Sequence, residues 1–487
     1  MEIFVFPGDS LVRPDGSYDA YYVGETWSLC TKYKYHTHKI ILYLSAMRQF
    51  ASSLEESGET VYYDKLDPET QLSYEEKLSR FLTEHDVESV TTYRMKDHGF
   101  TAVQDACETT NTSLSYLDNP TFLTNKEQMR SYAEDNKWHH ATFYKWQRRR
   151  LDILVEDGAP VNGQWSFDED NRESFDAIEN IPDLPSVEHG ETVGDVQELV
   201  ASSFPDHPGD ADTFWLPTTK DGARAWLQSF LDERFDDFGT YQDAMSAEVD
   251  TGYHSVLSPL LNTGLLEPET VVDEAVRHYE NNGTRYASVE GFIRQVIGWR
   301  EFMRGVYDNV DLKQNVFNHD RGLSQDWWDA STGLKPVDAV IDQANRIGYA
   351  HHIQRLMLAS NAMLLCEVDP DKVYDWFMSL YIDSADWVME PNVYDMGQFA
   401  TGGVFATKPY ISSSNYVRKM SDYSNGEWCD EWDALYWSFL HRHRDALSDN
   451  HRMSFMLSLL DKKGDDELER INERAGEVRE RLTVELD

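Results

Sequence analysis

A turn rich in hydroxyl side chains is the first stretch that could bind a ligand. HSVLSPLLNTGLL (254–266) places Ser255 and Ser258 where a turn opens a predicted helix. Backbone N–H groups and hydroxyls at such a turn can bind a diphosphate, because the start of a helix leaves its first N–H groups free. Alternatively, Ser255 or Ser258 only caps the helix. This stretch alone leaves both interpretations open.

Two further stretches carry charged or titratable side chains. FIRQVIGWREFMRGVY (292–307) interleaves charged and aromatic residues on a predicted helix, which suits either a cofactor site or an ordinary amphipathic helix. The residues concerned are Arg300, Glu301, Arg304, Trp299 and Phe302. Two histidines stand in series at His351 and His352. Histidine titrates near neutrality and can act as a general acid, although a single buried histidine is more often structural.

Near the N-terminus, Gly8-Asp9-Ser10-Leu11 follows a short apolar segment. The same four letters open the GDSL esterases, whose serine nucleophile needs a neighbouring base. Those enzymes usually take the base from an Asp-x-x-His pair near the C-terminus, whereas Asp449 and His451 are only two residues apart here. We therefore interpret the tetrapeptide as a strand-to-helix turn and keep a hydrolase as the alternative from a different class.

The charge of the chain is extreme, since 87 acidic and 44 basic residues give a net charge of −43. Acidic residues spread along all 487 positions are typical of a surface adapted to high salt, so we expect a halophilic source. At about 1 M salt the Debye length is only about 3 Å, so overall repulsion is screened and local contacts decide. The charge therefore does not exclude a nucleic-acid partner.

The composition also argues against several protein classes. The chain has no run of about 18 apolar residues, the length of a membrane span, and its start lacks the basic flank and long apolar core of a signal peptide. The four cysteines are far apart and match neither a disulfide framework nor a zinc site. They are Cys30, Cys107, Cys366 and Cys429. We expect a cytoplasmic monomer with no membrane partner and no metal site.

In the first 130 residues, segments with the hydrophobic pattern of a β-strand alternate with segments that have the pattern of a helix. Strand-like segments at 2–6, 60–66 and 88–93 alternate with helical spacing at 39–54 and 74–84. Strands and helices that alternate at this interval predict a doubly wound parallel sheet.

The remainder of the chain is predicted to be mainly helical. Within 131–216, a basic helix at 143–155 is followed by an acidic, proline-bearing stretch at about 168–212, which predicts an interdomain connection. From 217 to 487 helical patterns dominate, and the last 25 residues predict a solvated helix. The predicted fold class is therefore α/β plus all-α: an α/β domain at 1–130, then a helix and linker, then a large helical domain.

The pair S-x-L-S-P-x-L and W-R-E-F resembles the flavin-binding helical domain of photolyases and cryptochromes. More narrowly, the chain resembles the bacterial and archaeal branch of (6-4) photolyases and their cryptochrome relatives, often called the iron–sulfur branch. Further matching stretches run in order along nearly the whole chain. They are KIILYLSAMRQF (39–50), LDNPTFL (117–123), NGQWSFDEDNR (162–172), FGTYQDAM (238–245), YAHHIQRLM (349–357), EPNVYDMGQFATGGVFATKPY (390–410), MSDY (420–423) and ALYWSFLHRHR (434–444).

The resemblance implies a bent FAD inside the helical domain, where the protein positions and tunes the cofactor. The implied contacts are Ser255, Leu257 and Ser258 at the diphosphate, Tyr241 and His254 near it, Arg300 and Glu301 on the cofactor wall, Asp383 and Asn392 at the isoalloxazine ring, and Met396, Phe399 and Gly402 in a loop that closes over the ring.

The resemblance also implies a reaction. In the family, repair of a (6-4) photoproduct takes an electron from excited reduced flavin and a proton from the protein. His352 is implied as the main proton donor, with His351 in support. Trp376 and Trp328 match the family's electron-transfer positions, with core packing as the alternative for either. Phe377 stands where relatives often carry tyrosine.

UV-damaged DNA is the implied partner. The damaged dinucleotide would be flipped into a pocket over the flavin, at an unpairing cost of a few kcal/mol that a lesion reduces. Lys408, Tyr410 and Arg418 lie in a polar, moderately basic loop that could hold the phosphates. The basic run 148–150 is a second candidate, with a packed basic helix as its alternative.

The residues for the branch's four-iron cluster are incomplete. A thiolate-ligated cluster needs about four converging cysteines. Residues 333–340 correspond to one ligand segment and contain no cysteine. Ser424 stands at a second ligand position, and only Cys429 lies near the fourth. We therefore predict that the protein has no iron–sulfur cluster.

The antenna pattern is also incomplete. Relatives hold 6,7-dimethyl-8-ribityllumazine between the loop after the first strand and the segment matching 32–39. Gly8, Asp9, Ser10 and His36 keep part of that pattern, but Leu29 replaces an expected glutamate. A lumazine antenna therefore stays an open expectation.

The function implied by the resemblance is that of a light-driven (6-4) photolyase. Such a lyase repairs UV-induced pyrimidine–pyrimidone photoproducts in DNA by electron transfer from reduced FAD. The alternative within the family is a cryptochrome, a blue-light flavoprotein photoreceptor without repair activity.

Overall fold

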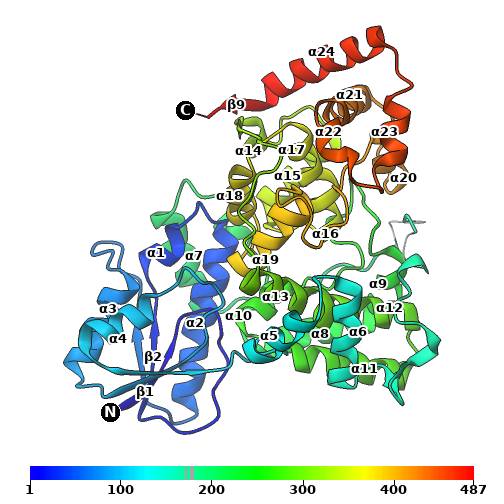
Figure 1. The fold of residues 1–487 in the computed structure, drawn as a ribbon. Helices are drawn as coiled ribbons and strands as arrows, with labels where there is room; N and C mark the ends of the chain where they lie inside the picture. The colour runs from blue at the N-terminus through cyan, green and yellow to red at the C-terminus, as the bar shows by residue number, and fades with distance from the viewer. Residues whose placement is uncertain (171–172, 176–179, 487) are drawn as a thin grey trace.

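The computed structural model describes residues 1–170, 173–175 and 180–486. A parallel sheet lies in the N-terminal part of the molecule, and helices form most of the rest (Figure 1). The sheet has five strands in the order β3-β2-β1-β4-β5, which confirms the predicted doubly wound topology. The strands are β1 (Glu2–Phe6), β2 (Ala20–Gly24), β3 (Val61–Asp64), β4 (Ser89–Tyr93) and β5 (Ser113–Leu117).

Helices cover both faces of this sheet. Side chains of β1 alternate between the two faces, so that Phe4 and Phe6 join one buried cluster while Ile3 and Val5 join another. Burial on both faces explains why strand β2 is apolar throughout. The covering helices are α1 (Trp27–Thr31) and α2 (Thr37–Glu56) with the first cluster, and α3 (Tyr74–Glu84) and α4 (Ala102–Thr110) with the second.

A connecting part follows the sheet. Its elements are α5 (Lys126–Asp135), α6 (His140–Leu151), the hairpin β6 (Val155–Glu156) and β7 (Ala159–Pro160), the short turns η1 (Val161–Gly163) and η2 (Asp168–Asp170), α7 (Glu191–Ser203) and η4 (Ala211–Thr213). The predicted basic helix is α6, which ends at Leu151 because Asp152 adopts a left-handed conformation with φ 56°. The predicted linker contains α7, which packs against α2. Positions 171–172 and 176–179 of that linker lie outside the described residues.

The C-terminal part is helical, as predicted. Its helices are α8 (Lys220–Glu233), α9 (Phe235–Tyr241), α10 (Ser258–Thr263), α11 (Pro268–Asn282), α12 (Tyr286–Ile293), η5 (Arg294–Arg300), α13 (Glu301–Asn309), α14 (Asp326–Asp329), α15 (Lys335–Ile347), α16 (His352–Gln354), η6 (Arg355–Ser360), α17 (Asn361–Leu365), α18 (Pro370–Leu380), α19 (Asp386–Glu390), η7 (Pro391–Gly397), α20 (Ser414–Lys419), α21 (Glu427–Arg442), α22 (Arg444–Ser448), α23 (Ser454–Leu460) and α24 (Asp465–Leu482). A two-stranded antiparallel ribbon joins β8 (Arg321–Leu323) to β9 (Thr483–Glu485).

The last helix, α24, was predicted to be solvated, and the structure corrects this in part. Ala475, Val478 and Leu482 are fully buried, because α24 packs along α21. Arg481 also donates to Glu431 of α21 at 2.6 Å. The polar residues of α24 therefore cover only its outer face, and the helix forms one edge of the helical core (Figure 1).

The sheet and the helical part are joined by buried polar contacts to backbone atoms. Glu301 accepts hydrogen bonds from the N–H groups of Leu123 (3.1 Å) and Thr124 (2.9 Å). Lys39 of α2 donates to the carbonyl oxygen of Ser384 at 2.7 Å. Since Glu301 and Lys39 are buried, these bonds hold the two parts at a defined distance.

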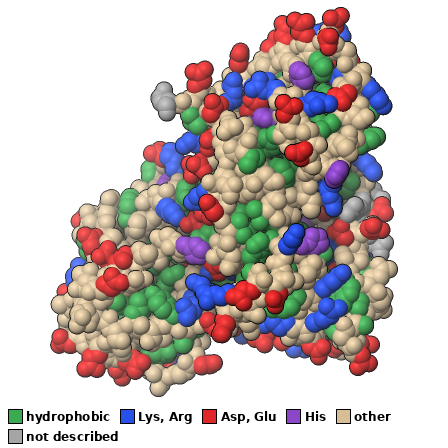
Figure 2. All heavy atoms as spheres, viewed as in Figure 1, with side chains coloured by type: hydrophobic (Ala, Val, Ile, Leu, Met, Phe, Trp, Pro, Cys, Tyr) green, Lys and Arg blue, Asp and Glu red, His purple; other side chains and the backbone are tan. Residues whose placement is uncertain are grey.

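No helix in the described ranges is both long and apolar enough to cross a membrane. The visible face carries acidic side chains around much of its periphery, while hydrophobic side chains group inside this rim and histidine side chains lie scattered among them (Figure 2).

Buried histidines make the stability of the fold depend on pH. Burial lowers the pKa of His36 and of His140 to about 3, from an ordinary value of 6.5. The unfolded chain therefore binds more protons than the folded chain between about pH 6.5 and 3, so these residues make the fold less stable as the pH falls through that window. We expect the urea concentration at the unfolding midpoint, measured at fixed salt, to decrease as the pH is lowered through that window. This dependence of the midpoint on pH should be weaker in His36→Asn, because the asparagine amide does not titrate. An unchanged slope in that variant would contradict the assignment.

Candidate cofactor and lesion site

A buried ion pair lies at the centre of the helical part. Arg355 of η6 binds both carboxylate oxygens of Asp383, at 2.8 and 3.2 Å, and the side chains are only 12% and 9% exposed. The Ser258 hydroxyl donates to the same carboxylate at 2.6 Å. The structure thus joins Ser258 and Asp383, which were both predicted to contact a cofactor, through a residue that was not predicted, Arg355.

The histidine pair lies beside the predicted diphosphate turn. The rings of His254 and His351 stack at 4.6 Å with an angle of 10° between their planes. His254 Nε2 also lies 3.0 Å from the carbonyl oxygen of Gln242. His351 is buried, while the side chain of His352, at the start of α16, is exposed. Two separately predicted motifs therefore form one wall.

The pKa values of these histidines depart from the sequence-based expectation of titration near neutrality. Burial lowers the pKa of His254 to about 4, and that of His351 well below its ordinary value. Part of the His352 side chain is exposed, but many protein atoms lie around the ring and disfavour its charged form. This desolvation and the positive charge of Arg355 lower the pKa of His352 as well. At neutral pH the protein by itself holds all three rings uncharged.

The turn before α10 fits an anionic group. Ser255 and Ser258 are half-buried, and Val256 between them has a positive φ of 53°. Arg234 lies behind the turn and donates to the carbonyl oxygen of His254 at 3.3 Å, but its Nε and Nη2 have no acceptor among the described residues. A buried cation without a bonded counter-charge favours an anion near the turn. The turn therefore fits the diphosphate of FAD.

The loop predicted to close over the flavin is held by a buried carboxylate. Asp395 accepts hydrogen bonds from the N–H groups of Val404 (2.7 Å), Phe405 (3.0 Å) and Ala406 (2.8 Å). Gly403 has φ 97°, and a Cβ there would lie 2.4 Å from the Ala406 carbonyl oxygen. The loop therefore needs glycine at this position.

The other predicted flavin contacts lie on or near the same elements. Met396 and Phe399 are buried at the base of the loop, and Gly402 is exposed at its tip. Asn392 of η7 donates to the carbonyl oxygen of Val388 at 2.7 Å. Tyr241, at the end of α9, is half-buried, and Leu257 is buried next to Ser258.

Arg300 and Glu301 do not bond to the group around Asp383. Arg300 donates to the carbonyl oxygen of Thr121 at 2.6 Å, and its guanidinium lies 4.5 Å from the ring centre of Phe122. Glu301 binds the adjoining backbone N–H groups. Their polar contacts therefore brace the contact between the sheet domain and the helical part, and their predicted place on the cofactor wall is not supported by these bonds.

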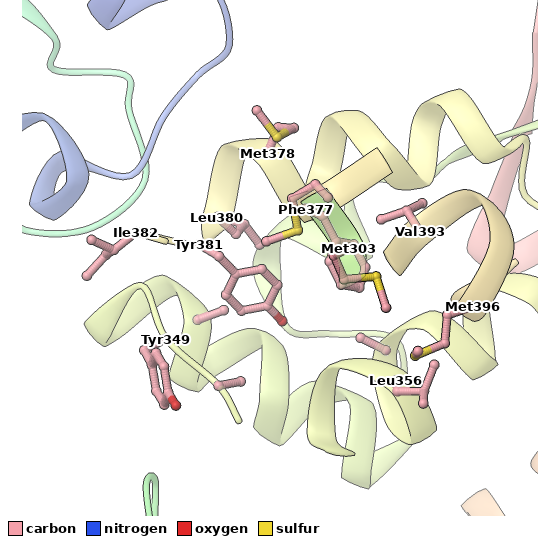
Figure 3. Packing of buried hydrophobic residues seen from close by; sticks show 14 of the residues in the cluster. Met303, Tyr349, Leu356, Phe377, Met378, Leu380, Tyr381, Ile382, Val393 and Met396 are labelled. Carbon is pink, nitrogen blue, oxygen red and sulfur yellow. The ribbon is translucent and has the colours of Figure 1, made fainter. Parts of the chain in front are cut away.

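An aromatic group connects the ion pair to a predicted electron-transfer residue. The Arg355 guanidinium lies 3.9 Å from the ring centre of Tyr381, which is 5.9 Å from that of Trp376 and 5.4 Å from that of Phe377. Tyr381 and Phe377 project into a common interior between helices (Figure 3). Trp376 is fully buried, and Trp328 on α14 is half-buried. Trp376 therefore lies one aromatic ring from the ion pair.

The predicted DNA loop is accessible, and the second candidate, the basic run 148–150, is accessible in part, since Arg149 is exposed and Arg150 is half-buried. Lys408 and Tyr410 are half-buried, and Arg418 on α20 is exposed. Arg148 of α6 is fully buried and donates to the carbonyl oxygen of Trp165 at 3.1 Å. Packing therefore accounts for Arg148, and the exposed Arg149 leaves both interpretations of this basic run open.

Three of the four predicted antenna residues are buried. Ser10 is fully buried and accepts a hydrogen bond from Asn119 at 2.9 Å, which also leaves an esterase nucleophile without access to substrate. His36 is fully buried as the N-cap of α2, with Nε2 3.0 Å from the carbonyl oxygen of Asn345. Gly8 is buried against Met47, so only Asp9 remains partly open.

The described residues show no grouping of His, Cys, Asp and Glu that could hold a metal ion. All four cysteines are buried and unpaired. Burial raises the pKa of Cys366 to about 12, which is typical of an unreactive core thiol.

Sequence reasoning missed Arg355, Asp395 and Arg234. Arg355 directly precedes the apolar residues 356–359, and an ionic residue next to such a run signals a buried partner. Asp395 precedes a Gly-Gly pair, which signals a loop whose N–H groups need an acceptor. Arg234 carries no such signal, since its neighbours are all charged or aromatic.

Known proteins and protein families match this chain over most of its length. Residues 8–216 match the family model described as deoxyribodipyrimidine photo-lyase-related protein, and residues 292–453 match the FAD binding domain of DNA photolyase. A (6-4) photolyase of Agrobacterium fabrum is 33% identical over 464 residues, which cover 92% of this chain and 89% of that protein.

Solved structures share the fold. A bacterial class III photolyase from Agrobacterium tumefaciens has a TM-score of 0.59 at 16% identity, covering 99% of this chain and 96% of that one. A Synechocystis cryptochrome has a TM-score of 0.56 at 14% identity, covering 98% of both chains. With an identity above 30% along most of a photolyase, and with the FAD-binding domain of that group, the chain belongs to the photolyase/cryptochrome family.

Proposed function

We propose that the protein is a light-driven (6-4) photolyase that repairs UV-induced pyrimidine–pyrimidone photoproducts in DNA. The observation that carries this proposal is the wall formed by His254, His351 and His352 beside the Arg355–Asp383 pair. It puts an accessible histidine next to the residues that fit FAD. The similarity to a (6-4) photolyase along most of the chain supports the same lesion specificity.

In this proposal FAD, when bound, supplies the electron for repair. Ser255 and Ser258 bind the diphosphate, and Arg355 with Asp383 orients the isoalloxazine ring. His352 donates a proton to the lesion. Because its pKa is lowered in the protein alone, His352 must gain its proton when the negatively charged DNA enters.

The distribution of acidic residues supports a DNA-binding face. Four stretches of this very acidic chain contain no Asp or Glu: 136–151, 251–266, 343–366 and 396–421. Of these, 136–151 and 396–421 carry several exposed residues, whereas 251–266 is buried or half-buried throughout. They adjoin one another in the fold. His254 stacks on His351, Gln398 donates to Ser360 at 2.9 Å, and Phe302 contacts both His140 and Phe405 at 5.5 Å between ring centres.

Such a face would let phosphates approach a protein that otherwise repels them. Lys408 and Arg418 supply positive charge within it, and Tyr410 lies between them in sequence. We therefore place the DNA backbone along residues 396–421.

The proposal is tested by blue-light repair of an oligonucleotide that carries one (6-4) lesion, at high salt, with a cyclobutane dimer as the control substrate. We expect repair of the (6-4) lesion alone. A protein that binds flavin and reduces it in light, but repairs neither lesion, would instead be a cryptochrome. That second candidate is supported by the fold shared with a cryptochrome.

An antenna chromophore such as the ribityl-lumazine is a further part of the proposal. Ligands of doubly wound sheets bind at the carboxyl ends of the strands, where the neighbouring strands β1 and β4 lie on either side of the point at which the strand order reverses. Nearby, burial lowers the pKa of Lys39 to about 7 and raises that of Asp97. Extraction of the purified protein and mass spectrometry of the released chromophore would identify it.

We also propose that no iron–sulfur cluster is present. The expected result is that purified protein contains far less than one iron atom per chain, as measured by inductively coupled plasma mass spectrometry. Four iron atoms per chain would overturn this. A cytoplasmic location, a monomeric state and a halophilic source remain part of the same proposal, and sedimentation at high salt would test the monomer.

A further inference from the structure

The peptide group that joins residues 350 and 351 is hydrogen-bonded on both sides. The carbonyl oxygen of Ala350 accepts from Arg355 Nε at 2.6 Å. The N–H group of His351, at the other end of the same peptide bond, donates to Gln354 Oε1 at 3.1 Å. Because a peptide group is planar, these two bonds fix its orientation. They therefore constrain the backbone from which His352 projects at the start of α16.

Gln354 is itself held by a second buried glutamine on α15. Its Nε2 donates to Gln343 Oε1 at 2.9 Å, and Gln343 Nε2 donates to the carbonyl oxygen of Asp250 at 2.7 Å. Gln354 and Gln343 are only 1% and 4% exposed. This amide pair, Gln343 and Gln354, thus connects the loop before His254 to the N–H group of His351.

The two ends of the chain of bonds set the direction of both amides. A backbone carbonyl can only accept, so Gln343 must turn its NH2 group to Asp250 and its oxygen to Gln354. A backbone N–H can only donate, so Gln354 must turn its oxygen to His351 and its NH2 group to Gln343. Every bond is made in one orientation alone, since a flip of either amide would break two bonds.

Core packing does not explain why glutamines stand at these two positions. The other buried residues of α15 are apolar, namely Pro336, Val337, Val340, Ile341 and Ala344. Replacing both partners of a buried hydrogen bond by apolar groups of the same shape is nearly neutral for stability. What an apolar pair would not provide is a defined orientation of the 350–351 peptide.

The same peptide is also connected to the proposed flavin site. Arg355 holds the Ala350 carbonyl oxygen through Nε while its two Nη atoms bind Asp383. On the other side, the loop that contains Asp250 leads into His254, whose ring stacks on that of His351. The backbone at 350–352 is therefore held between two segments that are proposed to bind FAD.

We propose that Gln343 and Gln354 are positioning residues, which orient the 350–351 peptide so that His352 presents its imidazole to the lesion. This inference rests on the proposed function, in which His352 donates the proton. Neither glutamine contacts the substrate; both act through the N–H group of His351. A displacement of about 1 Å at a reacting group can slow a reaction by about 10²-fold. Loss of the amide pair should therefore slow repair while flavin stays bound.

The experiment is a double-mutant cycle on single-turnover repair of a (6-4) lesion under saturating light, with rates taken per flavin-loaded chain. Methionine matches glutamine in length but has no amide, so the variants are Gln343→Met, Gln354→Met and the two combined. We expect a loss of about 10²-fold in Gln354→Met and of about tenfold in Gln343→Met. Since Gln343 acts only through Gln354, the combined variant should be no slower than Gln354→Met alone.

The matched control is Gln197→Met. Gln197 of α7 donates to the carbonyl oxygen of Ala211 at 2.7 Å, so it has the same kind of bond to the backbone, but it lies in the connecting part of the chain. This variant should repair at the wild-type rate. A wild-type rate in Gln343→Met or Gln354→Met, or two losses that multiply in the combined variant, would overturn the positioning role and leave the proposed function intact.

A second measurement does not depend on repair. Hydrogen–deuterium exchange, read by mass spectrometry at residue resolution, reports the protection of the His351 N–H group, whose acceptor is Gln354. We expect this N–H to exchange about tenfold faster in Gln354→Met and at the wild-type rate in Gln197→Met. A wild-type protein that repairs neither lesion would contradict the proposed function. Unchanged exchange of His351 in Gln354→Met would instead overturn the amide pair.

Discussion

Replacing Asp383 by asparagine is expected to lower the free energy of unfolding by about 3–5 kcal/mol and to leave the protein without bound flavin. The change leaves Arg355 buried without a counter-charge, and removing one partner of a buried ion pair costs energy on this scale. It also weakens the bond from Ser258. Urea denaturation and the flavin absorbance of the purified protein measure the two effects.

The matched control is Asp250→Asn. Asp250 binds Arg346 through two bonds of 2.9 Å, the same arrangement as in the Arg355–Asp383 pair, but the two side chains are 38% and 51% exposed. We expect a loss below about 1 kcal/mol for this exposed pair. Equal losses in the two variants would show that burial does not set the strength of the Asp383 interaction.

The second large effect is expected for His352→Ala, which should slow repair of the (6-4) lesion by about 10²–10⁴-fold, the usual contribution of a general acid. Flavin binding should be unchanged, because the side chain is exposed and the Arg355–Asp383 pair stays in place. Repair by wild-type protein should rise as the pH falls, since the lowered pKa of His352 leaves it mostly neutral at pH 7.

That pH dependence should vanish in His352→Ala. Single-turnover repair under saturating light, measured across a pH series, would show it. His441→Ala is the control, because His441 is an exposed histidine near the end of α21. Repair by His352→Ala at the wild-type rate would remove this residue from the mechanism.

The fold was largely predictable where one physical signal dominated. The helix at 74–84 has the bounds of α3, because Ser73 and Glu76 form a capping box that fixes its start. Strands β2 and β5 were not predicted. β2 carries five apolar or small residues, too few to tell a buried strand from a helix segment, and β5 at the sheet edge is mostly exposed.

The sequence predicted which motifs would contribute to the candidate site, but not which of their side chains would contact one another. The resemblance picked out Ser258 and Asp383, and the structure joins them. His36 was expected at an antenna, yet it faces α15, because a side chain at the N-cap of α2 is directed by long-range packing that no local pattern encodes. Arg355 did carry a local signal, since it stands directly before an apolar run, but its partner Asp383 lies 28 residues away and could not be identified from that signal.

The bonds of Glu301 to residues 123 and 124 have a consequence for how such chains diverge and can be recombined. Glu301 recognises two backbone N–H groups, which every amino acid except proline provides. The side chain at 123 can thus change without loss of these bonds, whereas one inserted or deleted residue would break them. Chimeras that exchange the sheet domain between relatives should therefore tolerate substitutions at 123, keep Phe122 for its contact with Arg300, and fail on a change in the length of this segment.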